Sequence, residues 1–175
     1  MNRRSGIPPS VRAPWVFVAL GSNLGNSRQI LRDAMARLAA FSAAPIRKSS
    51  LWETAPVDCP PGSPRFVNAA VGWAAGPEET PESLLLKLQS LEKEFGRAPK
   101  KVLNEPRPLD LDLIAFGEEI RNLPGLILPH PRAHLRRFVL QPLSEIAPGL
   151  ILPGQTRTVS QLLAALPPGG EVRRI

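Results

Sequence analysis

Cysteine is almost absent from this chain of 175 residues, which contains Cys59 alone. One cysteine cannot form a disulfide within the chain, and we expect Cys59 to be an unreactive thiol in a proline-rich loop. Long apolar runs are also missing, since no stretch approaches the roughly 20 residues that span a bilayer. The N-terminal segment lacks the apolar region of a secretory signal. We therefore expect a cytoplasmic protein that does not bind a membrane.

The motifs of several common site classes are missing as well. No cluster of histidine and cysteine indicates a zinc site, and no grouping of nucleophile, histidine and acid indicates nucleophilic catalysis. Residues 21–25 form a glycine-containing turn, but it has neither the Gly-Lys-Ser/Thr ending of a Walker loop nor the three glycines of a dinucleotide site. A tight turn is the favoured interpretation, although its backbone N–H groups could hold an anion.

The excess of positive charge lies mainly at the two ends of the chain. Of the formal net charge of +7, the first 14 residues supply three arginines and the last five supply one net charge. The remaining body is modestly basic, which suits an anionic small molecule as well as a polynucleotide. Residues 1–14 have no hydrophobic periodicity, so we expect a disordered leader that folding and activity do not need.

Hydrophobic periodicity predicts a regular order of strands and helices in the first two thirds of the chain. Strands are predicted over residues 15–20, 47–54, 66–73 and 109–116. One helix is expected to begin at Asn26 or Ser27, and another to begin with Thr80 as N-cap and end at Gly96. The order βαββαβ is the ferredoxin-like plan, an α+β fold with helices packed on an antiparallel sheet.

The last third of the chain is expected to add elements to this core. The pattern predicts a short helix over residues 132–143, a short strand over 150–152 and a final helix over 160–166. No repeat or linker interrupts residues 15–175, so we expect one domain.

Two aspartates mark the strand expected at residues 109–116. Asp110 and Asp112 are two positions apart, so they point to one face of the strand, roughly 7 Å apart. Aspartate is a poor strand former, and two neighbouring carboxylates repel each other and raise each other's pKa. A divalent cation between them would remove the repulsion and use both as oxygen ligands. A solvated acidic face is the alternative interpretation.

Basic residues flank this acidic pair in the sequence. They are Arg97, Lys100, Lys101 and Arg107 before the pair, and His130, Arg132, Arg136 and Arg137 after it. Two acids among so many cations are typical of a metal–polyphosphate site, in which carboxylates hold Mg²⁺ and cations bind phosphate oxygens. His130 stands between two prolines, and its rigid position favours a phosphate donor. His134 is expected on a helix surface.

Four stretches carry a family resemblance. They are VALGSNLGN at residues 18–26, ETAPV at 53–57 with FVNAAV at 66–71, PRPLDLDL at 106–113 and LPHPRAHLRRFVLQPLSEIAP at 128–148. These stretches resemble the 6-hydroxymethyl-7,8-dihydropterin pyrophosphokinase family of folate synthesis, and the last two are the most specific. The resemblance implies one pyrophosphokinase domain over residues 15–175. It also implies transfer of the diphosphate of ATP to the pterin hydroxymethyl oxygen, with release of AMP.

The resemblance further implies roles for individual residues. Asp110 and Asp112 would hold two Mg²⁺ ions that bridge the phosphates of ATP, the co-substrate. Gln89 and Glu92 would contact the nucleotide. The residues that would bind the triphosphate and catalyse transfer of its diphosphate are Arg97, Arg107, His130 and Arg136.

The pterin pocket implied by the resemblance would be apolar with a few polar groups. Its residues would be Thr54, Val57, Phe66, Asn68 and Phe138. Phe66 and Phe138 would enclose the ring, which agrees with the general preference of a flat heterocycle for aromatic faces and amide hydrogen bonds. Where many family members have Trp-Gly before the Pro-Arg pair, this chain has Asn104-Glu105. It also has Pro99 at a position where a basic residue is common, so Lys100 or Lys101 would take that role.

Two other classes of protein share parts of this pattern. A ferredoxin-like RNA-recognition module would need exposed aromatic residues on central strands, where Phe66 and Trp73 stand. The acidic pair, however, would repel a phosphate backbone in the absence of metal. A nucleotide-sugar transferase with an Asp-x-Asp metal site would have a larger nucleotide-binding fold, which 175 residues barely permit. We therefore expect small-molecule substrates, no nucleic acid and a monomer.

Overall fold

The computed structural model describes residues 13–99, 102 and 105–175, so most of the expected leader, together with Lys100, Lys101 and Asn104, lies outside the described residues. The elements in chain order are β1 (Trp15–Ser22), α1 (Ser27–Ala39), β2 (Arg47–Lys48), β3 (Trp52–Thr54), β4 (Phe66–Ala74), α2 (Pro81–Glu94), β5 (Asp110–Phe116), β6 (Arg121–Leu123), β7 (Leu126–Leu128), the 3-10 helix η1 (Ala133–Leu135), α3 (Arg137–Ile146), α4 (Val159–Ala165) and β8 (Val172–Arg174). None of the described helices combines the length and the apolar character needed to span a membrane.

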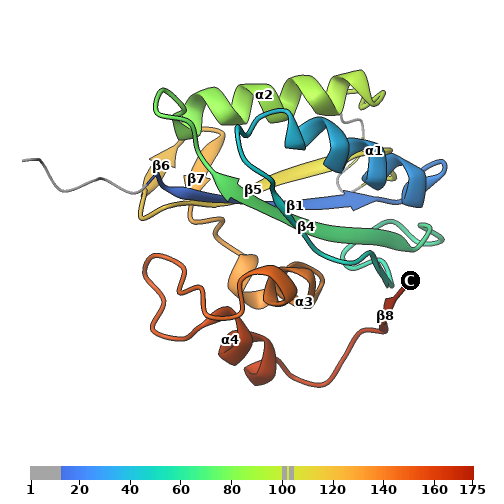
Figure 1. Cartoon of the computed structure of the whole chain (residues 1–175). Coiled ribbons are helices and arrows are strands. Elements are labelled where there is room, and N and C mark those ends of the chain that lie inside the picture. Colours follow the sequence, from blue (N-terminus) through green and yellow to red (C-terminus); the bar gives the residue numbers. More distant parts are fainter. Residues whose placement is uncertain (1–12, 100–101, 103–104) are drawn as a thin grey trace, which may run out of the picture.

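One antiparallel sheet organises the domain. Its strands follow the order β5-β1-β4-β3-β8, and β2 pairs with β4 beside β3. Helices α1 and α2 cover one face of the sheet, while α3 and α4 cover the other (Figure 1). With β2 and β3 together as the second strand, the elements up to β5 follow the βαββαβ order. The predicted α+β, ferredoxin-like fold is confirmed, and α3, α4 and β8 are its C-terminal additions.

The central strands are buried on both faces because helices cover the sheet on both sides. On β1, Val16, Val18 and Leu20 belong to the core under α1 and α2. Phe17 and Ala19 alternate with them and belong to the second core, against α3. A strand with two buried faces must be apolar throughout, which explains the continuous apolar run at the start of the domain.

Both predicted helix starts are confirmed. Asn26 Oδ1 accepts a hydrogen bond from Gln29 N at 3.3 Å at the start of α1. At the start of α2, Thr80 Oγ1 accepts from Ser83 N at 3.1 Å, and Ser83 Oγ accepts from Thr80 N at 3.0 Å. These caps satisfy N–H groups that have no partner inside a helix.

The strand predicted over residues 47–54 is interrupted between β2 and β3. Ser49 replaces a backbone acceptor with its hydroxyl, because Ala70 N donates to Ser49 Oγ at 2.9 Å. Ser50 N then donates to Glu145 Oε2 on α3 at 2.6 Å instead of joining the ladder. Side-chain bonds of this kind compete with regular pairing, so one predicted strand becomes two short ones.

The C-terminal predictions were partly wrong. The helix expected over residues 132–143 is η1 followed by α3, because Arg136 between them has extended dihedral angles, φ −112° and ψ 109°. The strand expected at residues 150–152 is a loop in which Leu150 bonds Ala147 and Val159 through its backbone. The final helix is confirmed as α4. The hairpin β6–β7 and strand β8 were not predicted, since each strand has three residues.

Candidate active site

Small residues on β1 separate polar residues on its two neighbouring strands. Gly21 pairs with Asp110 on β5 and with Asn68 on β4. Ala19 pairs with Asp112 on β5. A Cβ atom at Gly21 would lie 3.3 Å from Asn68 Oδ1 and 4.0 Å from Asp110 Cβ. Because Gly21 has no side chain and Ala19 has only a methyl group, β1 leaves room in which the acidic pair and Asn68 can face one ligand.

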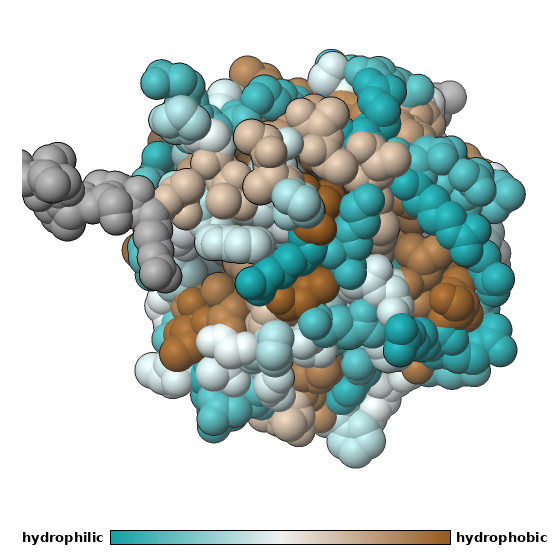
Figure 2. Space-filling model, in the orientation of Figure 1, coloured by the Kyte–Doolittle hydropathy of each residue, from teal (hydrophilic) through white to brown (hydrophobic). Residues whose placement is uncertain are grey.

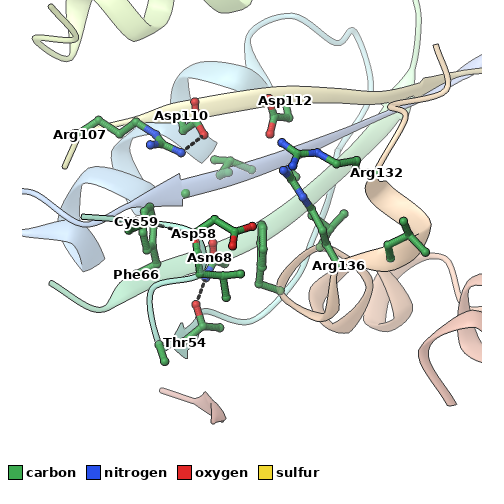
Figure 3. Close-up of a pocket in the computed structure, with 18 residues that line it drawn as sticks. Thr54, Asp58, Cys59, Phe66, Asn68, Arg107, Asp110, Asp112, Arg132 and Arg136 are labelled. Atoms are coloured by element: carbon green, nitrogen blue, oxygen red, sulfur yellow. Dashed lines mark hydrogen bonds and ion pairs between the residues drawn. The ribbon is translucent and has the colours of Figure 1, made fainter. Parts of the chain in front are cut away.

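This room is a cavity of about 270 Å³ between the sheet, α3 and the loop after β3. Nine of the predicted site residues line it: Thr54, Val57, Phe66, Asn68, Arg107, Asp110, Asp112, Arg136 and Phe138. Figure 3 shows the acidic pair on one side and the Thr54–Asn68 pair on the other, with the arginines between and beside them.

Asp110 is held by two arginines from outside its strand. Arg107 Nη2 lies 2.8 Å from Asp110 Oδ2, and Arg97 forms an ion pair with Oδ1. Burial alone would raise the pKa of Asp110, but the guanidinium groups of Arg107 and Arg97 hold that pKa below its ordinary value. Asp110 is therefore ionised at neutral pH.

The turn after β1 fixes the backbone of Arg107. Asn23 N donates to Arg107 O at 3.1 Å, and Arg107 N donates to Asn23 Oδ1 at 2.9 Å. The Asn23 side chain also donates to Pro64 O at 3.3 Å, just before β4. Asn23 was not predicted as a site residue. The tight turn at residues 21–25 thus connects three segments around the cavity.

Asp112 has a different electrostatic environment from Asp110. Its Oδ2 lies 4.0 Å from His130 Nε2, and the guanidinium groups of Arg132 and Arg136 point toward its side of the cavity (Figure 3). Burial and the nearby charge of Asp110 raise the pKa of Asp112 to about 6. Burial, reinforced by Arg136 and Arg132, lowers the pKa of His130 to about 4, so the imidazole is neutral at pH 7.

The acidic pair suits a hard cation that is shared with a bound anion. Two carboxylates on one strand face are hard oxygen donors, and the raised pKa of Asp112 means that a positive charge beside it would be favourable. In the part of the chain that the structure describes, no group of three or more His, Cys, Asp or Glu side chains could hold a metal. Water and phosphate oxygens would therefore have to complete the ligand shell, as is usual for Mg²⁺.

Glu92 lies behind β5 and does not line the cavity. Its Oε1 accepts a hydrogen bond from Leu111 N, the amide between the two aspartates, at 2.7 Å. The same oxygen pairs with Arg97, which also binds Asp110. Burial raises the pKa of Glu92 to about 7, although the Leu111 N–H and Arg97 oppose the shift. From this position Glu92 supports the strand and the arginine that shape the acidic pair.

The other half of the cavity joins an amide to two aromatic rings. Asn68 Nδ2 donates to Thr54 Oγ1 at 2.8 Å, and both residues are 4% exposed. Arg107 Cζ lies 5.4 Å from the centre of the Phe66 ring, and Arg136 Cζ lies 5.4 Å from that of Phe138. The arrangement can offer amide hydrogen bonds and aromatic surface to a flat ring.

Four predicted residues lie outside the lining of this cavity. They are Gln89, Glu92, Arg97 and His130. Gln89 is exposed on α2. Arg97 lines a second hollow of about 230 Å³, which it shares with Arg107. Since Arg107 lines both hollows, the two spaces adjoin at this residue.

Several lining residues were missed or weighted differently. Asp58, Cys59 and Leu135 line the cavity although no role was predicted for them, and Arg132 lines it beside Arg136. Asp58 has φ +52°, an uncommon angle for a residue other than glycine. The sequence places Asp58 and Cys59 next to Val57, and that adjacency was the available signal. It carries no information on which way the loop turns.

The fold and the cavity together define a ferredoxin-like α+β domain whose cavity combines carboxylates, arginines and aromatic rings. Residues 17–148 match the model of the family described as 7,8-dihydro-6-hydroxymethylpterin-pyrophosphokinase (HPPK). The chain belongs to this family, and the resemblance noted from its motifs is confirmed.

Relatives that match this chain over most of their own length, or over one part of it, support this assignment. The 2-amino-4-hydroxy-6-hydroxymethyldihydropteridine pyrophosphokinase of Pseudomonas aeruginosa is 41% identical over 156 residues, which are 87% of this chain and 91% of that protein. The protein of the same name in Bacillus subtilis is 40% identical over 131 residues, 74% of this chain and 76% of that one. The folic acid synthesis protein fol1 of Pneumocystis carinii is 39% identical over 139 residues, which are 79% of this chain but 18% of that protein.

Solved structures share the fold at low sequence identity. An HPPK-DHPS in complex with substrates aligns with a TM-score of 0.68 and 12% identity, over 88% of this chain and 43% of that one. The Plasmodium falciparum HPPK-DHPS aligns with a TM-score of 0.67 and 12% identity, over 87% of this chain and 44% of that one. This chain thus spans less than half of these longer proteins. None of the matches supports an RNA-binding module or a nucleotide-sugar transferase.

Proposed function

We propose that this protein transfers the diphosphate of ATP to 6-hydroxymethyl-7,8-dihydropterin, which gives the pterin diphosphate and AMP in folate biosynthesis. One observation carries the proposal: a single cavity joins the acidic pair and its arginines to an Asn68–Thr54 pair with aromatic rings nearby. The first half suits a polyphosphate and the second half suits a pterin. A reaction between the two substrates needs both halves in one space.

The chemical step exchanges one phosphorus–oxygen bond for another. The hydroxymethyl oxygen bonds to the β-phosphorus of ATP, and the bond from that phosphorus to the oxygen bridging the α-phosphate breaks. AMP leaves with this oxygen, and the hydroxyl proton passes to solvent. Such transfers depend on alignment and charge neutralisation more than on a strong base. Arg136 and Arg107, which line the cavity, would neutralise phosphate charge, with Arg97 and His130 near the same oxygens.

The acidic pair would hold Mg²⁺ together with the phosphates. Asp110 and Asp112 would supply the protein ligands, and two ions are expected. Bound there, the metal would withdraw charge from the phosphate oxygens and fix their orientation. In the structure, Asp110 forms ion pairs with Arg97 and Arg107. These arginines would move from the carboxylate to the phosphates when Mg²⁺ and ATP bind.

The Asn68–Thr54 pair would read the edge of the pterin ring. Because Asn68 Nδ2 is engaged by Thr54, its orientation is fixed and Oδ1 is left to accept from a ring N–H. Phe66 and Phe138 would supply faces for the ring, with Val57 at the loop side of the cavity. Gln89 would contact the nucleotide from α2.

The proposal also includes a monomer that works in the cytoplasm. Both faces of the sheet are covered by helices of the same chain, so neither needs a partner copy to bury it. On the face shown in Figure 2, polar side chains separate the apolar residues into several patches. Light scattering during size exclusion would test this, and a mass of twice 19.0 kDa would contradict it.

The direct test of function is release of AMP. Purified protein with ATP and Mg²⁺ should form AMP and a pterin diphosphate only when 6-hydroxymethyl-7,8-dihydropterin is added. Release of ADP in place of AMP would indicate transfer of one phosphoryl group. Pterin-independent hydrolysis would contradict the proposed acceptor.

Replacing Asn68 with alanine should weaken pterin binding much more than ATP binding. Leaving the buried polar edge of a ligand without its partner costs roughly 1–3 kcal/mol, or about five- to 150-fold in Kd. Calorimetry with each ligand separately measures both constants, and Asn122→Ala in the β6–β7 hairpin is a matched control outside the cavity. Equal losses for both ligands would mean that Asn68 supports the fold and does not read the substrate.

Replacing Glu92 with glutamine should raise the Mg²⁺ concentration needed for half-maximal turnover several-fold. The amide oxygen can still accept from Leu111 N, but the charge that shares Arg97 with Asp110 is lost. Arg97 would then bind Asp110 more tightly and compete with the metal. Glu94→Gln is the control, because Glu94 on α2 forms a solvent-exposed ion pair with Arg37 on α1. An unchanged Mg²⁺ dependence would show that Glu92 acts elsewhere.

A further inference from the structure

The chain beyond the family-matched residues 17–148 returns to β3, the strand that carries the cavity residue Thr54. After α4 it runs under the domain and ends as strand β8 on the edge of the sheet beside β3 (Figure 1). We propose that β8 is a positioning element for the pterin half of the site, holding β3 so that Thr54 keeps Asn68 in its reading orientation. The inference rests on the function proposed above and assigns a role there to the C-terminal residues.

Strand β8 is the only ladder partner of β3 other than β4 within the described chain. Their register pairs Thr54 with Val172 and Glu53 with Arg173. Ile175 N extends the contact by donating to Leu51 O at 3.0 Å. Because the break at Ser49 separates β3 from β2, β3 has three residues and forms few backbone hydrogen bonds with β4. Without β8 it would be a short edge strand bonded on one side.

Thr54 is the last residue of β3, so it responds to the support of that strand. It pairs with Phe66 on β4, and its hydroxyl accepts the hydrogen bond of Asn68 at 2.8 Å. The loop that follows carries Val57, which also lines the cavity. A shift of β3 would therefore move the hydroxyl that orients Asn68 and the start of the loop together.

Charged side chains connect β8 to the same wall of the cavity. Glu53 Oε1 lies 3.0 Å from Arg173 Nη2 and 3.2 Å from Arg65 Nε. Arg65, the residue before Phe66, also pairs with Glu171 at 3.0 Å. Exposed ion pairs contribute little each. The backbone ladder therefore carries most of the support, and the charges fix its register.

The start of the C-terminal segment is attached to the opposite wall. Arg137 Nη2 donates to Leu166 O at 3.3 Å and to Pro167 O at 3.1 Å, at the end of α4. Arg137 stands between Arg136 and Phe138, both of which line the cavity. Residues 166–175 thus connect the wall formed by α3 to the wall formed by β3. This connection can hold the width of the pterin half constant.

The test is a proline in β8. In an antiparallel ladder every second residue directs its N–H to the same neighbour. Since Ile175 N faces β3, Arg173 N does as well, and Arg173→Pro removes that donor. Arg174→Ser is the matched control, because it also removes one positive charge but keeps the backbone N–H. A second variant, truncated after Gly169, removes the strand entirely.

Calorimetry should find that Arg173→Pro and the truncation weaken binding of 6-hydroxymethyl-7,8-dihydropterin roughly tenfold, because small misplacements of binding groups have large effects. The Kd of a non-hydrolysable ATP analogue and the Kd values of Arg174→Ser should change less than about twofold. Faster hydrogen exchange of the Glu53 amide, which faces β8 in this register, should accompany the loss in the truncated variant. Unchanged pterin binding with a freed Glu53 amide would overturn the inference, as would equal losses for both ligands. If the wild type bound no pterin, the proposed function would fail first and this inference with it.

Discussion

Asp112→Asn is expected to lower turnover by roughly a thousandfold, the effect of losing several kcal/mol of charge stabilisation at the phosphates. The amide keeps the shape of the carboxylate but is a weaker ligand for a hard cation. Steady-state assays of AMP release at saturating ATP and pterin measure the loss. Near-normal Mg²⁺-dependent turnover in both Asp112→Asn and Asp110→Asn would remove the acidic pair from the mechanism.

The same substitution should make the ligand-free protein more stable at high pH. The pKa of Asp112 is raised to about 6, above the value of about 3.9 for an unfolded chain. The folded state therefore holds the proton more tightly. The stability from this group is complete below about pH 4 and is lost as the pH rises through 6. Asparagine undergoes no such loss, so urea unfolding should favour the variant more at pH 8 than at pH 5.

Asp110→Asn should lose activity as well but should behave oppositely in stability. Asp110 is paired with Arg97 and Arg107, and its lowered pKa means that the charged form stabilises the folded state at neutral pH. Its removal takes the carboxylate partner from Arg107 and leaves Arg97 with Glu92 alone, which costs about 1–3 kcal/mol. Opposite signs for the two aspartates would separate the ion-paired carboxylate from the one that repulsion and burial disfavour. A gain of stability in both variants would contradict the described ion pairs.

Arg136→Ala should reduce kcat by about a hundredfold while raising the KM for ATP much less. A donor that meets charge developing during transfer stabilises the transition state more than the bound substrate, and the loss of one such donor typically has this size. Arg136 is half-buried with its guanidinium over Phe138, whereas Arg132 is exposed. Water screens Arg132 more, so Arg132→Ala should have the smaller effect.

Steady-state kinetics of both variants, with Arg157→Ala as a control for the loss of one exposed positive charge, would test this order. A larger kcat effect of Arg132→Ala would indicate that Arg132, the N-cap of η1, makes the main phosphate contact. A rise in KM alone for Arg136→Ala would assign Arg136 to ground-state binding.

The part of the site that follows from strand geometry could be predicted from the sequence. Asp110 and Asp112 share a face because they are two positions apart, and they lie beside Gly21 and Ala19 as an antiparallel register requires. Helix starts at Asn26 and Thr80 were equally local, since a cap needs only the next three residues. Local rules therefore sufficed for these features.

The features that were missed depend on contacts between distant segments. The break in the second strand arises from a bond between Ser49 and Ala70, which spacing does not reveal. Arg97 and Arg107 both bind Asp110, although the sequence showed only that cations flank the acidic pair. The extended conformation of Arg136, which splits one expected helix, is likewise not encoded by periodicity.

The rival interpretation as an RNA-recognition module also depended on such packing. It required exposed aromatic residues on central strands. Trp73 is 1% exposed and lies in the core under α1 and α2, so it cannot stack on a base. Phe66 faces the cavity together with Arg107. Alternation along β4 shows which residues share a face, but the buried side could be identified only from the helices that cover it.

The outer edge of β5 has a consequence for how the protein behaves at high concentration. An edge strand presents free N–H and C=O groups on which a strand of another molecule can add, and this starts aggregation. Here Leu111 N is taken by Glu92, and Ile114 O accepts from His130 N at 2.9 Å. The Glu92 side chain and the His130 backbone thus protect the molecule against edge-to-edge association, so replacing Glu92 with a residue that cannot accept this bond endangers solubility as well as turnover.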